Sequence, residues 1–343
     1  VHHLSFFLQA LSGGTLMQVI IPLAGKGTRL RPHTHLVPKP MLKVAGRPVM
    51  DYVMDRLEGL PVSELIFITG HLKEQVEQYA TSRYPIPSRF VEQKVQDGTA
   101  GAVDLARKYV KEDVLIVFVD TVFEADLSLI TRTDADGIIW AKEVEDYQRF
   151  GVVVTDKDGF MTKIVEKPKE PISRLANIGL YYIRDTKALF AGIDAVKAAP
   201  KNKGEYYLTD AFQHMIERGR RIKTAEVGGW YDCGEVGTLL ESNEILLRKG
   251  RAKRPSAVPA GVTIVDPVYV EEGVVLERCT IGPNVSLEAG TKVVGGSLRN
   301  TLVGQNAVLT DCQLDGAILG DAVKATGLKG SASLGSHSEL TVR

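Results

Sequence analysis

The stretch IPLAGKGTRLRPHTHLVPKP, residues 21–40, decides how the rest of this chain is interpreted. It begins with the end of an apolar run and continues into a turn that contains Gly25 and Gly27. Arg29 follows the turn directly, and Lys39 stands further along between two prolines. Glycine turns expose backbone N–H groups, and arginine and lysine add positive charge. The stretch therefore predicts a binding site for an anionic phosphate chain.

The spacing within this turn excludes two common phosphate-binding loops. A P-loop would end in Gly-Lys-Ser or Gly-Lys-Thr, and the turn has no such ending. A dinucleotide-binding GxGxxG loop would need a third glycine where Leu30 stands. A glycine turn alone is a weak signal, because such turns join strands to helices in many folds. Its interpretation depends on residues elsewhere in the chain.

Strand-like and helix-like segments alternate from residue 18 to about residue 247. Strands are predicted at 18–23, 64–69, 89–91, 114–119 and 137–141, and helices at 49–57, 73–81 and 100–108. Short runs rich in valine, isoleucine and phenylalanine, separated by helices, indicate a mostly parallel α/β sheet. Further strands at 150–155, 160–165 and 177–183 suggest an antiparallel addition that covers a substrate.

The C-terminal part has a different pattern, in which apolar residues recur every five or six positions. These residues are Ile264, Val270, Leu276, Ile281, Leu287, Val293, Leu298, Val303, Leu309, Leu314 and Leu319. An imperfect hexapeptide repeat of this kind predicts a left-handed parallel β-helix. The alternative is a β-sandwich, whose strands would instead alternate with a period of two. Solenoid domains often serve as assembly surfaces, so we expect a homo-oligomer.

These patterns give a plan of the chain. Residues 17–248 form the main α/β domain, 249–261 a basic linker with prolines, 262–330 the β-helix and 331–343 a tail. Residues 1–16 contain an apolar patch without arginine or lysine, which does not fit a signal peptide. We interpret them as a tag or non-native extension that precedes Met17.

The composition of the chain argues against several classes of protein. The 343 residues include 42 basic and 42 acidic side chains, so no net charge attracts nucleic acid or an anionic membrane. No segment has the apolar length of a membrane span. Cys233, Cys279 and Cys312 lie far apart in the sequence and do not form a zinc-binding pattern. We expect a cytoplasmic protein with no nucleic-acid or membrane partner.

Two aspartates are candidate metal ligands. Asp120 ends the apolar run VLIVFVD, at the sheet edge where α/β proteins bind ligands. Asp120 could equally cap the following turn. Asp232 follows Trp230 and Tyr231. If the two aspartates meet, they form a plausible Mg²⁺ site, because magnesium prefers one or two carboxylates together with phosphate oxygens.

Two further groups of polar residues are candidates for binding a base and a sugar phosphate. Gln93 precedes the glycine turn 97–101, and its amide can hydrogen-bond the edge of a base. The second group fits sugar hydroxyls and a phosphate, and consists of Gly151, Glu166, Lys167 and Asn177. Each group could also be an ordinary turn or a surface ion pair.

Taken together, these residues resemble the sugar-1-phosphate nucleotidyltransferase family. The segments LAGKGTRLRP…PKPML, DGTAGAV, EKP, NIGLYYI, GEYYLTDAF and WYDCGEVGTLLESNEILL stand in the family's order and spacing. With its β-helix the chain looks most like the long-form glucose-1-phosphate thymidylyltransferases. This resemblance implies a Rossmann-like nucleotidyltransferase domain and a reaction that yields a nucleotide sugar and pyrophosphate.

The resemblance also implies roles for individual residues. The expected catalytic residues are Arg29, Lys39, Asp120 and Asp232, the last two as Mg²⁺ ligands. The expected nucleotide-binding residues are Leu23, Gly25, Gly27, Thr28, Gln93, Gly98 and Thr99. Gly151, Glu166, Lys167 and Asn177 would bind the sugar phosphate. The expected substrates are dTTP and glucose 1-phosphate, and UTP or GTP with another sugar 1-phosphate is the alternative.

Two residues depart from the family pattern. Lys26 and Val119 replace glycines, which we interpret as tuning specificity.

Two other functions are alternatives to an active nucleotidyltransferase. A catalytically silent regulatory or scaffold homologue is the first alternative, and the retained charged residues argue against it. Acyltransferase activity in the β-helix is the second. It is disfavoured because no histidine occurs between His214 and His337.

Overall fold

The computed structural model describes residues 16–342, so nearly all of the predicted N-terminal extension lies outside the described residues. The chain forms two compact units. Unit 1 contains the residues up to Gly25 together with Val53–Trp230, and unit 2 contains Lys26–Tyr52 together with the residues from Tyr231 onwards. This division differs from the predicted domain plan, because Lys26–Tyr52 groups with the C-terminal part of the chain.

Unit 1 is built on a mixed sheet whose central strands are parallel. The strand order is β10-β9-β11-β6-β1-β4-β5. Parallel pairing joins β1 to both β4 and β6, and β4 to β5. This confirms the predicted parallel sheet, with strands β1 (Met17–Pro22), β4 (Val62–Thr69), β5 (Ser88–Glu92) and β6 (Asp113–Val117).

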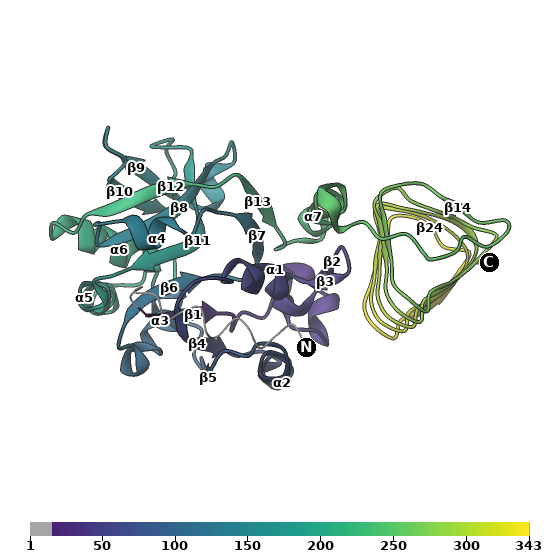
Figure 1. Ribbon diagram of the computed structural model, residues 1–343, viewed down its shortest axis with the longest axis horizontal. Coiled ribbons are helices and arrows are strands. Elements are labelled where there is room, and N and C mark those ends of the chain that lie inside the picture. Colours follow the sequence, from purple (N-terminus) through teal and green to yellow (C-terminus); the bar gives the residue numbers. More distant parts are fainter. Residues whose placement is uncertain (1–15, 343) are drawn as a thin grey trace. The chain divides into compact units, whose positions relative to one another are not determined.

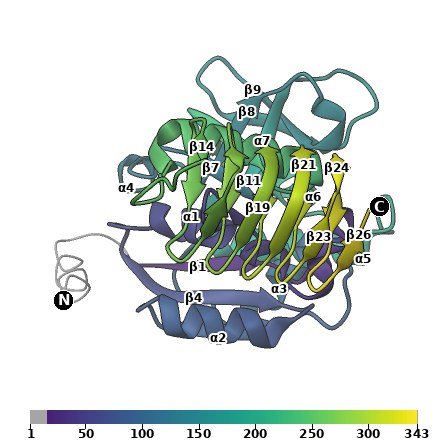
Figure 2. The same cartoon turned by 90° about the vertical axis from the view of Figure 1, so that its right-hand side faces the viewer.

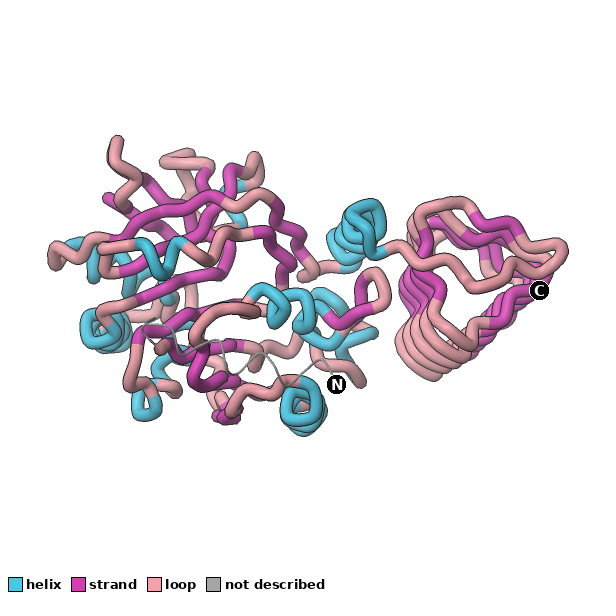
Figure 3. The backbone as a smooth tube through the Cα atoms, viewed as in Figure 1, coloured by secondary structure: helices cyan, strands magenta, loops and turns pink. Residues whose placement is uncertain are grey.

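The predicted antiparallel addition is also present. Strand β11 runs antiparallel to β6, β8 and β9, and β9 runs antiparallel to β10. Strand β12 adds to β8 in parallel. Figure 3 shows these strands in magenta. Their bounds are β8 (Gly137–Glu143), β9 (Gly151–Thr155), β10 (Met161–Glu166), β11 (Leu175–Ile183) and β12 (Ile222–Glu226). Strands β7 (Thr121–Glu124) and β13 (Gly229–Asp232) lie outside this sheet.

Helices bury the apolar residues of this sheet. One core cluster joins residues of β1, β4 and β6 to residues of α3, α5 and α6. The helices of the described residues are α1 (Val49–Arg56), α2 (Lys73–Arg83), α3 (Thr99–Asp104), α4 (Leu129–Arg132), α5 (Thr186–Ala198), α6 (Leu208–Glu217) and α7 (Val236–Leu246), the last of which belongs to unit 2. The helix predicted at 100–108 is shorter. Its backbone bonds change to the i−3 pattern from Leu105 onwards and lead into a 3₁₀ turn, η4 (Arg107–Tyr109).

The C-terminal part of unit 2 is a stack of parallel coils with a triangular outline (Figure 1). Figure 2 shows β14, β19, β21, β23 and β26 side by side on one face of the stack. That sheet contains β14 (Thr263–Ile264), β16 (Val275–Glu277), β17 (Thr280–Ile281), β19 (Lys292–Arg299), β21 (Val308–Asp315), β23 (Lys324–Thr326), β24 (Lys329–Gly330) and β26 (Glu339–Thr341).

A second sheet of five strands forms another face of the coils, in the order β15-β18-β20-β22-β25. All its pairs are parallel. We call this sheet the five-stranded face, which comprises β15 (Val268–Val270), β18 (Val285–Leu287), β20 (Leu302–Val303), β22 (Ile318–Leu319) and β25 (Ser333–Leu334). The predicted repeat residues from Val270 to Leu319 form the buried core of the stack. The parallel β-helix is thereby confirmed, and its ladder continues beyond residue 330 to β26.

The N-terminal segment of unit 2 consists of short turns and a hairpin. Strands β2 (Lys43–Val44) and β3 (Arg47–Pro48) pair antiparallel. The turns are η1 (Thr28–Leu30), η2 (His33–His35) and η3 (Lys39–Met41), and α7 continues into η6 (Leu247–Arg251). In the predicted linker, Lys253 pairs with Tyr269 of the first coil. No helix within residues 16–342 is long and apolar enough to cross a membrane.

Candidate functional site

The first half of the glycine turn belongs to unit 1 and leaves open space. Leu23 extends the pairing of β1 with β4, because its N–H donates to the carbonyl oxygen of Ile68 over 2.9 Å. The next residue, Ala24, packs closely on Gly70, where a Cβ would lie 2.6 Å from the Ala24 oxygen. At Gly25, by contrast, a Cβ would meet no atom within 4 Å. Gly25 therefore borders a space that the rest of the protein does not fill.

The second half of the turn belongs to unit 2 and is tightly packed. Gly27 has φ +58°, in the left-handed region that favours glycine. A Cβ there would lie 2.9 Å from Cγ2 of Thr34 and 3.2 Å from Cβ of Lys39. The Thr34 hydroxyl also donates to the Gly27 carbonyl oxygen over 2.8 Å. Gly27 is needed to bring the turn against the segment that carries Lys39.

Three of the four predicted catalytic residues surround one glycine in unit 2. A Cβ added at Gly234 would lie 2.8 Å from Oδ1 of Asp232, 3.4 Å from Nη2 of Arg29 and 3.6 Å from Nζ of Lys39. Arg29 also forms a 2.7 Å ion pair with Glu235, the residue that caps α7. The structure thus brings together two cations and a carboxylate, a combination that can hold a phosphate chain and a metal ion.

Sequence reasoning did not single out Gly234 and Glu235. Both lie in the segment WYDCGEVGTLLESNEILL, which was recognised as a motif without roles for these two positions. The signal was the glycine directly after the sequence Asp-Cys, where a side chain would occupy the space between the charged groups.

Asp120 lies in unit 1, just beyond the end of β6 and before β7. It is partly buried, and Val119 beside it is buried. Burial raises the pKa of Tyr181, and the negative charges of Glu166 and Asp120 add to this effect. Asp232 belongs to unit 2, so a pair of Asp120 with Asp232 would join residues of different units. This pairing stays a prediction.

The predicted base-binding residues form a compact group in unit 1. The buried Gln93 amide donates to Oδ1 of Asp97 over 3.2 Å and to the Gly98 oxygen over 3.4 Å. Gly98 has φ +120°, and a Cβ there would lie 2.4 Å from the backbone oxygen of Tyr206. The Thr99 hydroxyl accepts a 2.9 Å hydrogen bond from the N–H at the start of α6. Thr99 therefore has a structural role that the sequence did not suggest.

Two of the predicted sugar-phosphate residues, Glu166 and Asn177, meet at a third, Gly151. A Cβ on Gly151 would lie 2.4 Å from Nδ2 of Asn177, 2.8 Å from Oε2 of Glu166 and 2.9 Å from Cγ2 of Thr209. Asn177 donates to the Gly151 oxygen over 2.7 Å and accepts a hydrogen bond from Tyr181. Thr209 donates to Glu166 over 3.1 Å. The network fixes the amide and the carboxylate beside a position that only glycine leaves open.

Two lysines lie beside this group, and one of them was missed. Burial raises the pKa of Glu166, while Lys167, 3.9 Å from its Oε1, acts in the opposite direction. Lys203 donates to the Lys167 backbone oxygen over 2.6 Å. Lys203 and Thr209 lie within or next to the segment GEYYLTDAF, which was recognised as a motif without roles for its residues.

Comparisons with known proteins show which family the chain resembles. Residues 18–249 match the model of the family described as Nucleotidyl transferase. The bifunctional protein GlmU of Methanocaldococcus jannaschii is 35% identical over 260 residues, which cover 76% of this chain and 61% of GlmU. The UTP–glucose-1-phosphate uridylyltransferase AglF of Haloferax volcanii is 34% identical over 221 residues, 62% of this chain and 89% of AglF.

Among solved structures, a UDP-glucose pyrophosphorylase complexed with UDP-glucose matches with a TM-score of 0.60 and 24% identity. The match covers 68% of this chain and 99% of the solved one, and it supports the fold alone. The chain spans about three fifths of the length of the GlmU protein that it matches, since the coverage is 61%. The family model covers most of the chain and agrees with the motifs. The chain therefore belongs to the nucleotidyl transferase family.

Proposed function

We propose that the protein transfers a nucleotidyl group from a nucleoside triphosphate to a sugar 1-phosphate, giving a nucleotide sugar and pyrophosphate. The arrangement of Arg29, Lys39 and Asp232 around Gly234 is the observation that carries this proposal. Two cations beside a carboxylate suit a reaction in which negative charge shifts between phosphate groups. The family membership supports the same reaction class.

In this reaction an oxygen of the sugar 1-phosphate attacks the α-phosphorus of the triphosphate. The bond between the α-phosphorus and its bridging oxygen breaks, and pyrophosphate leaves with the electron pair. Arg29 and Lys39 stabilise the charge that develops on the phosphates, so the protein acts mainly by positioning and charge neutralisation. Gly25 leaves space for the phosphate chain, and Gly27 and Thr28 would provide backbone contacts to it.

Asp120 and Asp232 are the proposed ligands of a Mg²⁺ ion. Their carboxylate oxygens are the hard donors that this ion prefers. The Gly234 N–H holds one oxygen of Asp232 in place over 2.7 Å, which supports a fixed ligand position. When bound, Mg²⁺ supplies positive charge to the phosphate oxygens.

The proposed nucleotide is a pyrimidine nucleoside triphosphate, and the proposed sugar is glucose 1-phosphate. The motifs favour dTTP, whereas the relative AglF is named for UTP and glucose 1-phosphate. Leu23, Gln93 and Gly98 would contact the base. Glu166 and Asn177 would bind the sugar hydroxyls, and Lys167 its phosphate, because these groups converge on Gly151 or lie beside it.

A pyrophosphate-release assay tests the proposal. The purified protein with Mg²⁺ is given each of dTTP, UTP, GTP, CTP and ATP with several hexose 1-phosphates. We expect release with a pyrimidine nucleotide and glucose 1-phosphate, and the nucleotide sugar should appear in equal amount by chromatography. If no combination releases pyrophosphate, the chain is a silent homologue rather than an enzyme.

A further inference from the structure

In unit 2, the segment 26–52 lies against the β-helix and α7, and we call it the anchored loop. Its hairpin is held at Gly46, which lies against the ring of Tyr269 on β15. A Cβ on Gly46 would lie 2.1 Å from the nearest ring atom, so no other residue fits there without movement. Gly46 also has φ +78°, which favours glycine independently.

A second anchor is the side chain of Asn243, which is fully buried in α7. Its Oδ1 accepts hydrogen bonds from the Ala45 N–H over 2.9 Å and from the Ser286 hydroxyl over 2.6 Å. Its Nδ2 donates to the Asn284 oxygen over 3.1 Å. One amide thereby links the anchored loop to the second coil, and losing it would leave buried polar groups without partners.

A third anchor is an ion pair between Lys43 of the anchored loop and Glu288, which follows β18. The two charged atoms are 2.6 Å apart, and the side chains are only 25% and 14% exposed. Glu271 and Asp321 add negative charge near Lys43. A pair this far from water holds its geometry firmly, because separating the partners leaves a buried charge uncompensated.

The last anchors lie on the other side of Lys39 along the sequence. Nε2 of His33 is 3.0 Å from the hydroxyl of Ser333 on β25. A Cβ on Gly335 would lie 3.0 Å from Pro32, which shows close packing there. Lys39 therefore lies in a short turn with anchors to the β-helix both before and after it.

We propose that the β-helix positions Lys39 for nucleotidyl transfer through these anchors. The inference rests on the proposed function. Lys39 stands between Pro38 and Pro40, which stiffen its turn, so a shift of the hairpin would move the lysine. Charge neutralisation depends steeply on position, and a displacement of about 1 Å can cost about 100-fold in rate. Lys43, Asn243 and Glu288 are positioning residues on this account, because they act through the loop.

The test is a double-mutant cycle on the buried ion pair in the full chain. We expect Lys43→Met and Glu288→Gln each to lower kcat at least about tenfold, with the KM of the sugar 1-phosphate changed less than about twofold. The double variant should be no slower than the worse single variant, because both remove the same contact. Lys43→Arg should recover most of the rate.

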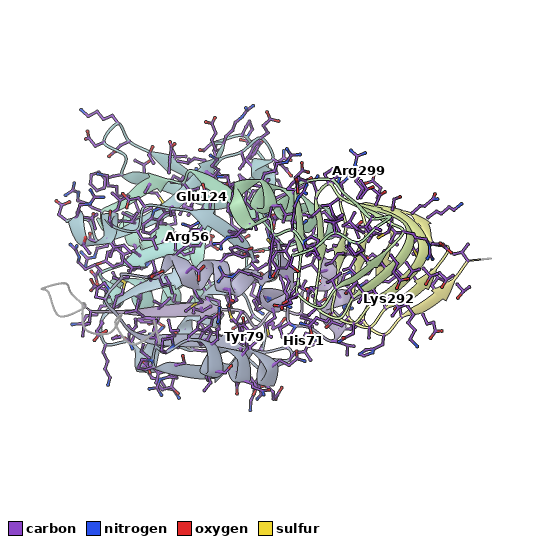
Figure 4. All side chains as sticks on the ribbon, turned by 45° about the vertical axis from the view of Figure 1, so that its right-hand side comes forward. Arg56, His71, Tyr79, Glu124, Lys292 and Arg299 are labelled. Atoms are coloured by element: carbon purple, nitrogen blue, oxygen red, sulfur yellow. The ribbon has the colours of Figure 1, made fainter. Side chains whose placement is uncertain are left out.

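The matched control is an exposed ion pair on the same β-helix, Lys292 with Glu277. Figure 4 labels Lys292. Its charged atoms are 3.2 Å apart, and the side chains are 45% and 43% exposed. Lys292→Met should leave kcat unchanged. Hydrogen exchange tests the anchoring independently of enzymatic activity. The backbone amides of Met41, Leu42 and Val49 should exchange faster in Lys43→Met than in the wild type, and they should be unchanged in Lys292→Met.

The outcomes separate this inference from the proposed function. An inactive wild type would overturn the function, and the exchange rates would still test the anchoring. An active wild type with normal kcat and exchange in Lys43→Met would overturn the inference. If Lys43→Met does not fold, the milder Ser286→Ala decides, with an expected kcat loss of a few-fold. Equal losses in Ser286→Ala and Lys292→Met would also overturn it.

Discussion

The backbone N–H of Gly234 donates to a carboxylate oxygen of Asp232 over 2.7 Å, and the same glycine leaves room for Arg29 and Lys39. We predict that Gly234→Ala lowers kcat about 10- to 100-fold, because the new methyl group would lie 2.8 Å from Asp232 and displace it. Steady-state kinetics with both substrates measure the change.

Gly237 in α7 provides the control for this substitution. A Cβ there would meet no atom within 4 Å, so Gly237→Ala should keep full activity. Alanine also favours a helix over glycine, by up to about 1 kcal/mol. A variant at Gly234 with normal kcat would show that the cluster around it is not the reaction centre.

A second prediction concerns the sugar side. Gly151→Ala would bring a methyl group within 2.4 Å of the Asn177 amide and 2.8 Å of the Glu166 carboxylate. We expect the KM of the sugar 1-phosphate to rise about tenfold, which corresponds to about 1.4 kcal/mol of binding energy. The KM of the nucleoside triphosphate should change much less. Equal increases in the KM values of the two substrates would contradict the proposal that Gly151 borders the site of the sugar 1-phosphate.

A third prediction concerns the metal. Asp120→Asn keeps the volume of the side chain and removes its negative charge, so we expect the rate to fall about 100-fold or more with an unchanged melting temperature. The dependence of the rate on Mg²⁺ concentration should shift to higher values. Near-normal turnover at low Mg²⁺ would mean that Asp120 is not a metal ligand.

A fourth prediction follows from His33. Burial lowers the pKa of His33 from 6.5 to about 4. Between these values the unfolded chain binds a proton that the folded protein does not, so stability is complete above pH 6.5 and falls as the pH drops toward 4. The loss approaches about 3 kcal/mol, at about 1.4 kcal/mol for each pKa unit.

The measurement is denaturant unfolding of the wild type and His33→Gln between pH 7 and pH 4. Other groups titrate in this range, so the difference between the two proteins carries the information. The wild type should lose more stability than the variant on acidification. Parallel stability curves would show that His33 is not buried in its neutral form.

Much of the fold was predictable because it depends on local patterns. The apolar repeat from Val270 to Leu319 predicted the β-helix, since each coil buries its own apolar residues on the next. The parallel strands were predictable from runs that are apolar on both faces. The helix at 100–108 was predicted too long, because its last residues change to 3₁₀ geometry.

The grouping of residues 26–52 with the β-helix was not predictable. It rests on single polar contacts between positions far apart in the sequence, such as Ala45 with Asn243 and Lys43 with Glu288. Such contacts have no periodicity that a sequence reveals. Arg29 and Lys39 were identified from a motif that specifies charged residues, and the structure places both beside Gly234. Gly234 was missed because its contribution is the absence of a side chain.

The order of contacts along the five-stranded face has a consequence for the evolution of this protein. Gly46 meets β15 in the first coil, Lys43 meets the residue after β18 in the second, and His33 meets β25 in the last. The anchored loop thus contacts the five-stranded face at or next to its first, second and last strands, so the length of the loop must match the number of coils. Free solenoids can gain or lose whole repeats, but here a duplicated or deleted coil would separate His33 from Ser333. Coil number and loop length are expected to change together or not at all.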